Sequence, residues 1–116
     1  MRKMTSTNYE NEIKLKDECA MIYTLSLISG RWKPIIFWKL IDKKLRTSEL
    51  KRSISHISER MLLSQLKEME EDKLIEKTIY KEVPPRVEYQ LTKLGESLSP
   101  ALLMLSAWGV ENHKKF

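Results

Sequence analysis

The chain has 116 residues, a length that favours one domain with a modest core. Its 41% hydrophobic and 32% charged content indicates a globular protein, and no apolar run reaches the length of a membrane span. The net charge of +5 and pI of about 9.3 permit nucleic-acid binding without establishing it. A single cysteine excludes an internal disulfide framework, and the polar N-terminus excludes a secretory signal, so we expect a cytoplasmic protein without membrane contact.

The first expected element is an N-terminal helix over residues 9–30. Its apolar run "CAMIYTLSLIS" ends at Gly30, a residue suited to the position just after a helix. A second helix is expected in "RWKPIIFWKLIDKK", because Pro34 is tolerated in a first helical turn. We expect Trp32 and Trp38 to lie in the core.

Two helices joined by a short turn are predicted over residues 47–72. In "RTSELKRSI", Thr47 or Ser48 is the expected N-cap of a short helix. The polar turn "SHIS" follows. Ser58 then caps a longer helix that runs to about Asp72, with Glu59 in the first turn where the helix dipole favours an acid.

The hydrophobic period then changes from helical to alternating. "LIEKTIYKEV" and "RVEYQLT" predict two strands, and Pro84 and Pro85 mark the tip of a hairpin over residues 74–91. Thr92 is the expected N-cap of a C-terminal helix over 92–113, which Pro100 bends or divides. This order predicts a mainly α fold with a small β-hairpin, a winged helix-turn-helix, as one domain over 1–116.

The longer helix has two distinct faces when its residues are placed at about 100° intervals. Leu62, Leu66 and Met69 form a stripe that is expected in the core. The N-terminal half presents Ser58, Arg60, Ser64 and Lys67, and Leu63 and Met61 flank this polar face on either side. Because the acidic residues gather at the far end, phosphates would repel that end, and the helix is expected to enter a DNA groove by its N-terminus.

Charge around this helix agrees with that orientation. Residues 43–60 contain six Lys or Arg against two acids, which places +4 of the formal +5 in this stretch. Phosphate contacts supply most non-specific affinity for DNA and need such a concentration of positive charge. The plainer alternative is a set of solvated charges on a helical domain. The order of elements favours DNA binding.

At several motifs the chain resembles the HxlR-type winged-helix transcriptional regulators of bacteria and archaea. The matching text is Cys19, "ISGRWKPIIFWKL", "RTSELKRSI", "ISERMLLSQLKEMEEDKLIEK", "VPPRVEYQLTKLGESL" and Trp108. The most specific part is "PPRVEYQLT" after a helix that ends in "LKEMEEDKLI", and the resemblance covers most of the chain.

The resemblance implies a homodimer that binds a double-stranded DNA operator and pairs through its N- and C-terminal helices. The longer helix would read the major groove, with contacts from Ser58, Arg60, Leu63, Ser64 and Lys67. Arg46, Lys51 and Arg52 would lie beside phosphates, and Lys81 and Arg86 would act from the wing. Arg86 is otherwise a surface charge beside a turn.

The chain departs from the family pattern at Lys73 and Leu63, and it also lacks the usual aromatic residue near Thr47 and the usual Gly around Lys43 and Lys44. Lys73 stands where Gly is usual after the recognition helix, and a left-handed Lys would cost about 1 kcal/mol, so we expect that turn to be built differently. Leu63 stands where Thr is common, which predicts a different base preference. An apolar side chain there can touch a thymine methyl.

Cys19 has two interpretations. Members of the resembled family use a cysteine at this position to sense oxidants or electrophiles, and the start of a helix lowers a thiol pKa. Asp17 and Glu18 oppose thiolate formation, however, and a buried free cysteine is often a small apolar residue. Cys19 is therefore a candidate redox sensor, which could pair with the same residue of a second chain.

An enzyme and a protein-interaction module are the alternatives to a DNA-binding protein. An enzyme is not expected, because Cys19, His56 and His113 come without a phosphate loop, nucleophile elbow or metal-spaced cluster; no cofactor or metal is predicted. The main alternative is a small interaction module that dimerises through its terminal helices without sequence-specific DNA binding. The predicted dimer stripe lies on the C-terminal helix: Leu98, Leu102, Leu105 and Trp108.

Overall fold

Helix α2 (Ala20–Ile28) belongs to the first of two structural units. The computed structural model describes residues 19–115, so the helix predicted for residues 9–18 lies outside the described residues. Backbone contacts divide the chain into residues 1–30 and 31–116, and each unit is described by itself. In the first, helix α2 spans Ala20–Ile28 after Cys19, which has extended backbone. Gly30 has a φ of 99°, which confirms its predicted position after the helix.

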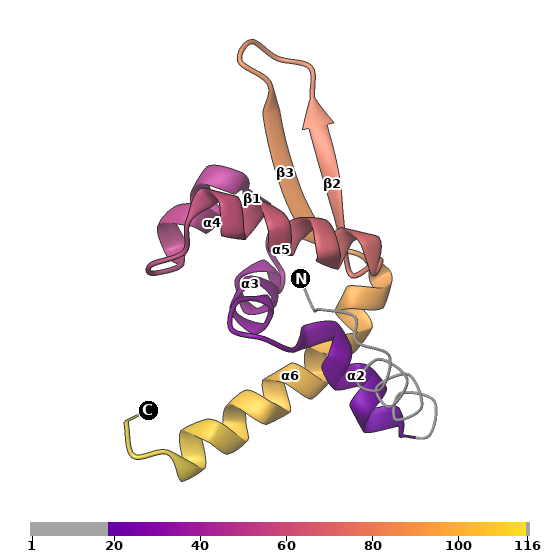
Figure 1. The fold of residues 1–116 in the computed structure, drawn as a ribbon, viewed down its shortest axis with the longest axis vertical. Helices are drawn as coiled ribbons and strands as arrows, with labels where there is room; N and C mark the ends of the chain where they lie inside the picture. The colour runs from indigo at the N-terminus through magenta and orange to yellow at the C-terminus, as the bar shows by residue number, and fades with distance from the viewer. Residues whose placement is uncertain (1–18, 116) are drawn as a thin grey trace, which may run out of the picture. The chain divides into compact units, whose positions relative to one another are not determined.

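The second unit is a winged helix-turn-helix (Figure 1). Its elements follow in the order α3 (Lys33–Leu40), β1 (Leu45–Arg46), α4 (Thr47–Ser53), α5 (Glu59–Glu71), β2 (Ile75–Tyr80), β3 (Arg86–Leu91) and α6 (Lys93–Asn112). The predicted fold class, mainly helical with a small β-hairpin, is confirmed.

The sheet has one strand more than the predicted hairpin. Its order is β1-β3-β2 with both pairings antiparallel, so β3 is the central strand. The register pairs Leu45 with Tyr89 and Ile79 with Val87. Strand β1 has only two residues, too few for an alternating pattern to reveal it. The turn of the hairpin lies between Tyr80 and Arg86 and contains both prolines, as predicted.

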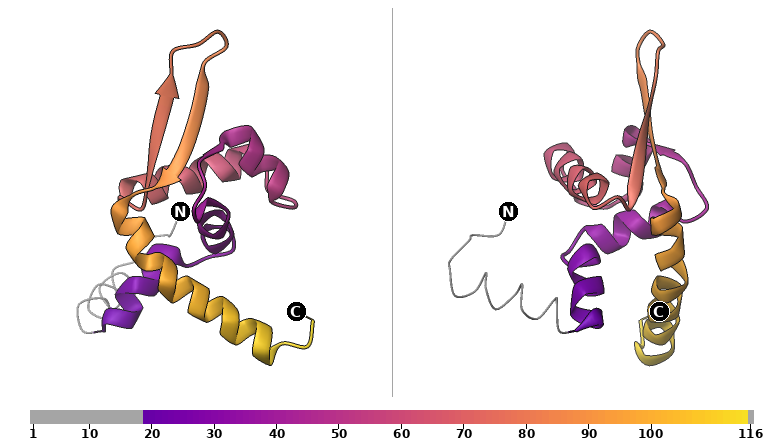
Figure 2. Two further views of the ribbon diagram at one scale, coloured as in Figure 1. Left: turned by 180° about the vertical axis from the view of Figure 1, so that it is seen from behind. Right: turned by 90° about the vertical axis from the view of Figure 1, so that its right-hand side faces the viewer.

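A single apolar core joins the helices to the base of the sheet. α5 contacts β2, α3 and α4 contact β3, and the hairpin projects beyond the helices (Figure 2). The most buried side chains are Ile36, Phe37, Leu40, Leu50, Ile57, Leu62, Leu66, Met69, Leu74 and Ile75. The prediction for the second helix was partly wrong: Trp38 is exposed and Trp32 is half-buried, because Ile36, Phe37 and Leu40 form the inner face of α3.

The turn after α5 corrects the expectation for Lys73. Lys73 has a φ of 65°, so this position adopts the left-handed backbone conformation although its residue is not glycine. The amide of Leu74 donates to Met69 O at 3.0 Å and that of Lys73 to Glu70 O at 3.0 Å. This pair of hydrogen bonds defines a Schellman motif, which satisfies the last carbonyls of the helix. Burial of Leu74 beyond the turn offsets the strain at Lys73.

α6 begins tightly against this same turn. Thr92 Oγ1 accepts a hydrogen bond from the amide of Gly95 at 3.1 Å and donates to Lys73 O at 2.6 Å, so the predicted N-cap is confirmed. A Cβ at Gly95 would overlap the carbonyl oxygen of Leu74, so only glycine permits this approach. Pro100 does not divide the helix, which continues to Asn112.

Candidate nucleic-acid interface

The short helix α4 begins one residue earlier than predicted. Its N-cap is Arg46, and Thr47 is already helical, so neither Thr47 nor Ser48 caps the helix. The amide of Arg46 donates to Glu49 Oε1 at 2.8 Å, which replaces the expected hydroxyl cap with a carboxylate in the first turn. Because Arg46 also ends β1, the sheet leads directly into the helix-turn-helix.

The turn between α4 and α5 is held by apolar residues on both sides. Ile54 and Ile57 are buried, while His56 between them is exposed with a φ of 65°. Ser58 Oγ then accepts a hydrogen bond from the amide of Met61 at 3.0 Å, which confirms Ser58 as the N-cap of α5. The start of α5 is therefore fixed by burial before it and by a cap within it.

An ion pair holds α5 against α3. Lys33 Nζ lies 3.0 Å from Glu68 Oε1, and Lys33 is only 8% exposed. A buried ammonium group needs such a partner, because its charge would otherwise be desolvated without compensation. Sequence reasoning missed this pair, since the residues are 35 positions apart and no local spacing connects them.

The two faces of α5 differ as predicted. Leu62, Leu66 and Met69 are completely buried and confirm the core stripe. The side chains proposed to face DNA are all exposed: Ser58, Arg60, Leu63, Ser64 and Lys67. Met61 is also exposed, and its sulfur accepts a hydrogen bond from Gln65 Nε2 at 3.6 Å.

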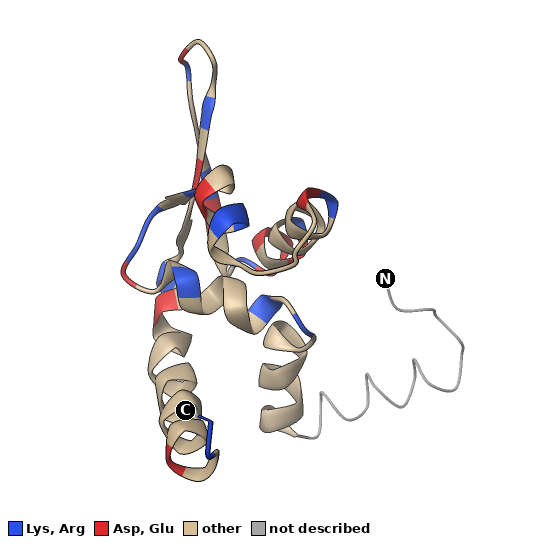
Figure 3. Ribbon diagram, turned by 90° about the vertical axis from the view of Figure 1, so that its left-hand side faces the viewer, with Lys and Arg blue, Asp and Glu red and all other residues tan. Residues whose placement is uncertain are grey.

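Positive charge gathers on the same helices. Lys and Arg positions, blue in Figure 3, lie on α4, at the start of α5 and along the hairpin, where acidic positions accompany them. Most acids of α5 lie toward its C-terminal end. Within residues 19–115, no ion pair engages the exposed cations proposed to meet phosphates: Arg46, Lys51, Arg52, Arg60, Lys67 and Lys81. These charges are available to an anionic partner.

Arg86 differs from the other predicted contacts because it is half-buried within the wing. Its Nη2 lies 3.1 Å from Glu82 Oε2, and its Nε lies 3.9 Å from Glu88 Oε2, beyond hydrogen-bond range. Its guanidinium carbon stacks 4.1 Å from the centre of the Tyr80 ring. The i,i+4 spacing of Glu82 and Arg86 was visible in the sequence, but not the fold of the turn that brings them together.

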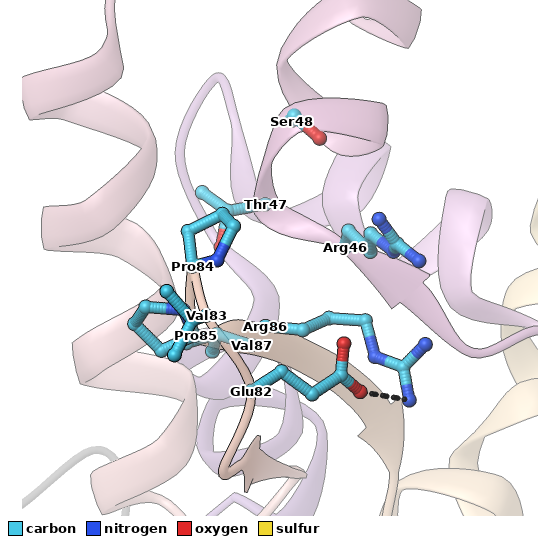
Figure 4. A pocket seen from close by; sticks show the side chains of 9 residues that line it. All are labelled: Arg46, Thr47, Ser48, Glu82, Val83, Pro84, Pro85, Arg86 and Val87. Atoms are coloured by element: carbon cyan, nitrogen blue, oxygen red, sulfur yellow. Dashed lines mark ion pairs between the residues drawn. The ribbon is translucent and has the colours of Figure 1, made fainter.

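The wing and the start of α4 enclose a shallow pocket of about 400 Å³ (Figure 4). Arg46, Thr47 and Ser48 line it from the helix side. The turn of the hairpin supplies the other wall: Glu82, Val83, Pro84, Pro85, Arg86 and Val87. The pocket thus places the backbone of the wing tip beside the first turn of α4, where a DNA strand would pass in the predicted arrangement.

Tyr89 connects this helix to the central strand. Burial raises the pKa of its hydroxyl above the usual value, and the negative charge of Glu70 acts in the same direction. A side-chain hydrogen bond with Thr47 opposes them. Tyr89 of β3 therefore lies close to Thr47, the first residue of α4.

A second exposed surface lies on α6 and is apolar. Of the predicted dimer stripe, Leu102 is buried and Leu98 half-buried, while Leu105 and Trp108 are 58% and 68% exposed. Further large apolar side chains of this helix are exposed as well: Leu94, Leu103, Met104 and Val110. A helix that is apolar on most of its circumference normally requires cover.

Neither a helix that could span a membrane nor a metal-binding cluster occurs in the part of the chain that the structure describes. No helix among these residues is long and apolar enough to span a membrane. Residues 19–115 contain no cluster of three His, Cys, Asp or Glu side chains that would hold a metal. Cys19 is a half-buried free thiol.

Comparison with known proteins identifies the family. A family model described as "HxlR-like helix-turn-helix" matches residues 27–116. The chain is 45% identical to the putative regulatory protein MalR of Fusobacterium mortiferum, over 87% of this chain and 96% of that protein. It is 44% identical to the HTH-type transcriptional regulator BH0655 of Halalkalibacterium halodurans, over 94% and 97% of the two chains.

Solved structures agree with these sequence relatives. The redox regulator HypR in its reduced form is similar with a TM-score of 0.80 and 41% identity, over 83% of this chain and 95% of that one. A putative regulator of the MarR family from Porphyromonas gingivalis has a TM-score of 0.78 and 37% identity, over 96% and 99%. The chain therefore belongs to the HxlR-like helix-turn-helix family of transcriptional regulators.

Proposed function

We propose that this protein is a homodimeric regulator that binds a specific, nearly palindromic DNA operator. The observation that carries the proposal is the exposed N-terminal half of α5. There Arg60, Ser64 and Lys67 share a face, and the two cations form no ion pair within residues 19–115. A capped helix with such a face fits the major groove, which is wide enough for an α-helix. The cations of α4 and the wing would neutralise adjacent phosphates.

Dimerisation sets the form of the operator. In this proposal two copies pair through their terminal helices, with the exposed Leu105 and Trp108 of α6 in the contact. Two recognition helices of a symmetric dimer enter successive major grooves about 34 Å apart, so the half-sites would be inverted repeats one helical turn apart.

The proposed contacts divide into two classes. Base-edge contacts come from the exposed face of α5: Ser58, Arg60, Leu63, Ser64 and Lys67. Phosphate contacts come from α4, the end of β1 and the wing: Arg46, Lys51, Arg52, Lys81 and Arg86. Arg86 would have to exchange part of its pairing with Glu82 for a phosphate, so we assign it mainly to positioning the wing tip.

Selection of bound sequences from random DNA, followed by affinity measurements, tests this function. Arg60→Ala should weaken operator binding more than non-specific binding, because a bidentate contact to a base contributes about 1–3 kcal/mol of discrimination. Lys51→Ala should weaken both and reduce the slope of log affinity against log salt by about 1. Absence of any selected sequence, or intact operator preference in Arg60→Ala, would contradict the proposal and favour a protein-interaction module.

A redox response through Cys19 is a second part of the proposal. It rests on the likeness to HypR, which is described as a redox regulator, and on the position of Cys19 at the N-cap of α2. Because the chain has one cysteine, a disulfide between two cysteines of this protein joins two chains. The two thiols would lose two protons and two electrons to an oxidant such as diamide.

Operator affinity and non-reducing electrophoresis after diamide treatment test the redox proposal. The wild type should form a linked dimer and change its operator affinity, and Cys19→Ser should do neither. Unchanged operator binding by the oxidised protein, or an equal response of Cys19→Ser, would remove Cys19 from the regulatory mechanism.

A further inference from the structure

Leu63 is an exposed leucine that the core does not need. It is 44% exposed, whereas Leu62 and Leu66 on the same helix are completely buried. Those two residues, with Met69, already complete the inner face of α5. The side chain of Leu63 therefore remains available for a contact outside the chain.

The neighbours of Leu63 on the helix surface are charged: the acid Glu59 and the cations Arg60 and Lys67. At about 100° per residue, its side chain lies about 60° from Arg60 and about 40° from Lys67 around the helix axis. Helical side chains also lean toward the N-terminus, so Leu63 covers the turn that precedes its own Cα. The side chain of Leu63 is therefore an apolar group surrounded by charged side chains, near the end of α5 that would enter a groove.

The groups that bases expose in the major groove limit which of them a leucine side chain can contact favourably. Thymine presents a C5-methyl group in the major groove. The remaining groups on the base edges there are hydrogen-bond donors and acceptors. A leucine placed against an amino group or carbonyl oxygen would remove water from it without replacing the hydrogen bond. A leucine against a methyl group instead buries apolar surface on both partners.

We propose that Leu63 selects a thymine in each half-site by contact with its 5-methyl group. The proposal rests on the DNA-binding function proposed above and adds a specific base preference to it. Arg60 and Lys67, which flank Leu63 in space, would hold the helix at the depth at which this contact forms.

Met61 provides a matched control on the same helix. It is 40% exposed, almost as much as Leu63, and its sulfur is engaged by Gln65 Nε2. Its side chain lies about 160° from that of Leu63 around the axis, so the two cannot contact the same base edge. Truncation of Met61 removes a similar apolar area without affecting the proposed contact.

The test replaces each thymine of the selected operator in turn with deoxyuridine, which lacks only the methyl group. Fluorescence anisotropy at fixed salt then measures the affinity of the wild type, Leu63→Ala and Met61→Ala. At one position in each half-site, the deoxyuridine substitution should weaken wild-type binding about fourfold. This is the change in affinity that corresponds to burial of one methyl group, about 0.8 kcal/mol. Leu63→Ala should lose this sensitivity and keep its salt dependence, and Met61→Ala should keep both.

Two failures of this experiment are distinguishable. If the wild type binds a selected operator but no deoxyuridine substitution weakens it, or if Leu63→Ala stays equally sensitive, the thymine contact is wrong and the DNA-binding function stands. If the wild type shows no operator preference at all, the proposed function falls, and the thymine contact falls with it.

Discussion

The two exposed surfaces of the second unit differ in chemistry although both belong to helices. The N-terminal half of α5, with α4 and the wing, presents cations and hydroxyl groups around one leucine. The second half of α6 presents Leu103, Met104, Leu105, Trp108 and Val110. Water solvates the first surface well, whereas the second loses free energy as long as it is uncovered. The charged surface suits a polyanion, and the apolar surface suits a protein partner.

The two surfaces also differ in how far the sequence alone reveals them. The charged surface could be recognised from spacing within one helix, because its polar row and core stripe are both local patterns. The apolar surface could not be divided into inner and outer residues in the same way, since large apolar side chains occur on most sides of α6. Only the packing of Leu102 against its own chain shows which side is already occupied.

The largest expected effect comes from placing a charge on the apolar surface. Trp108→Asp should weaken self-association at least about a hundredfold, because both copies in a symmetric dimer lose the residue and each buried aromatic residue at the centre of an interface often contributes 2 kcal/mol or more. Sedimentation over a range of protein concentrations measures the change. The variant should remain folded, since Trp108 is 68% exposed in the single chain.

Asn112→Asp is the control, because it adds the same charge to the same helix at a polar position. It should leave self-association almost unchanged. If Trp108→Asp associates as strongly as the wild type, the apolar surface of α6 serves another purpose than pairing two copies.

A substitution where α6 joins the wing should have the next largest effect. Gly95→Ala places a methyl group against the carbonyl of Leu74 and should lower the free energy of unfolding by about 2–3 kcal/mol. Gly109→Ala, in the same helix with no atom within 4 Å of the added Cβ, should raise it by about 0.5–1 kcal/mol. Urea denaturation measures both. Equal effects of the two variants would mean that the close approach of α6 to Leu74 is wrong.

The smallest effect concerns charge at the tip of the wing. Glu82→Gln removes a carboxylate that pairs with Arg86 at 3.1 Å, so it should raise DNA affinity about two- to threefold at low salt. Glu111→Gln changes the net charge equally on the C-terminal part of α6 and should have little effect. A titration at two salt concentrations compares them. An equal gain in both variants would show that net charge, and not the location of the wing carboxylate, controls affinity.

Much of the fold followed from local patterns in the sequence. The core stripe of α5, the hydroxyl caps Ser58 and Thr92, and the proline turn of the hairpin each depend on residues a few positions apart. Helix caps and periodic apolar stripes depend on residues that are close together in the sequence. They could therefore be predicted without tertiary information. The family resemblance then indicated which face would meet DNA.

Tertiary structure decided the features that depend on distant residues. β1 exists because Leu45 and Arg46 meet β3, and the Lys33–Glu68 pair joins helices that no local spacing relates. Lys73 keeps a left-handed backbone since the Schellman hydrogen bonds and the buried Leu74 outweigh its strain. Folding of the wing places Arg86 between Tyr80, Glu82 and Glu88, and the sequence did not reveal these contacts. In each case the deciding partner lies on another element or across a turn, beyond what a helical or strand period can reveal.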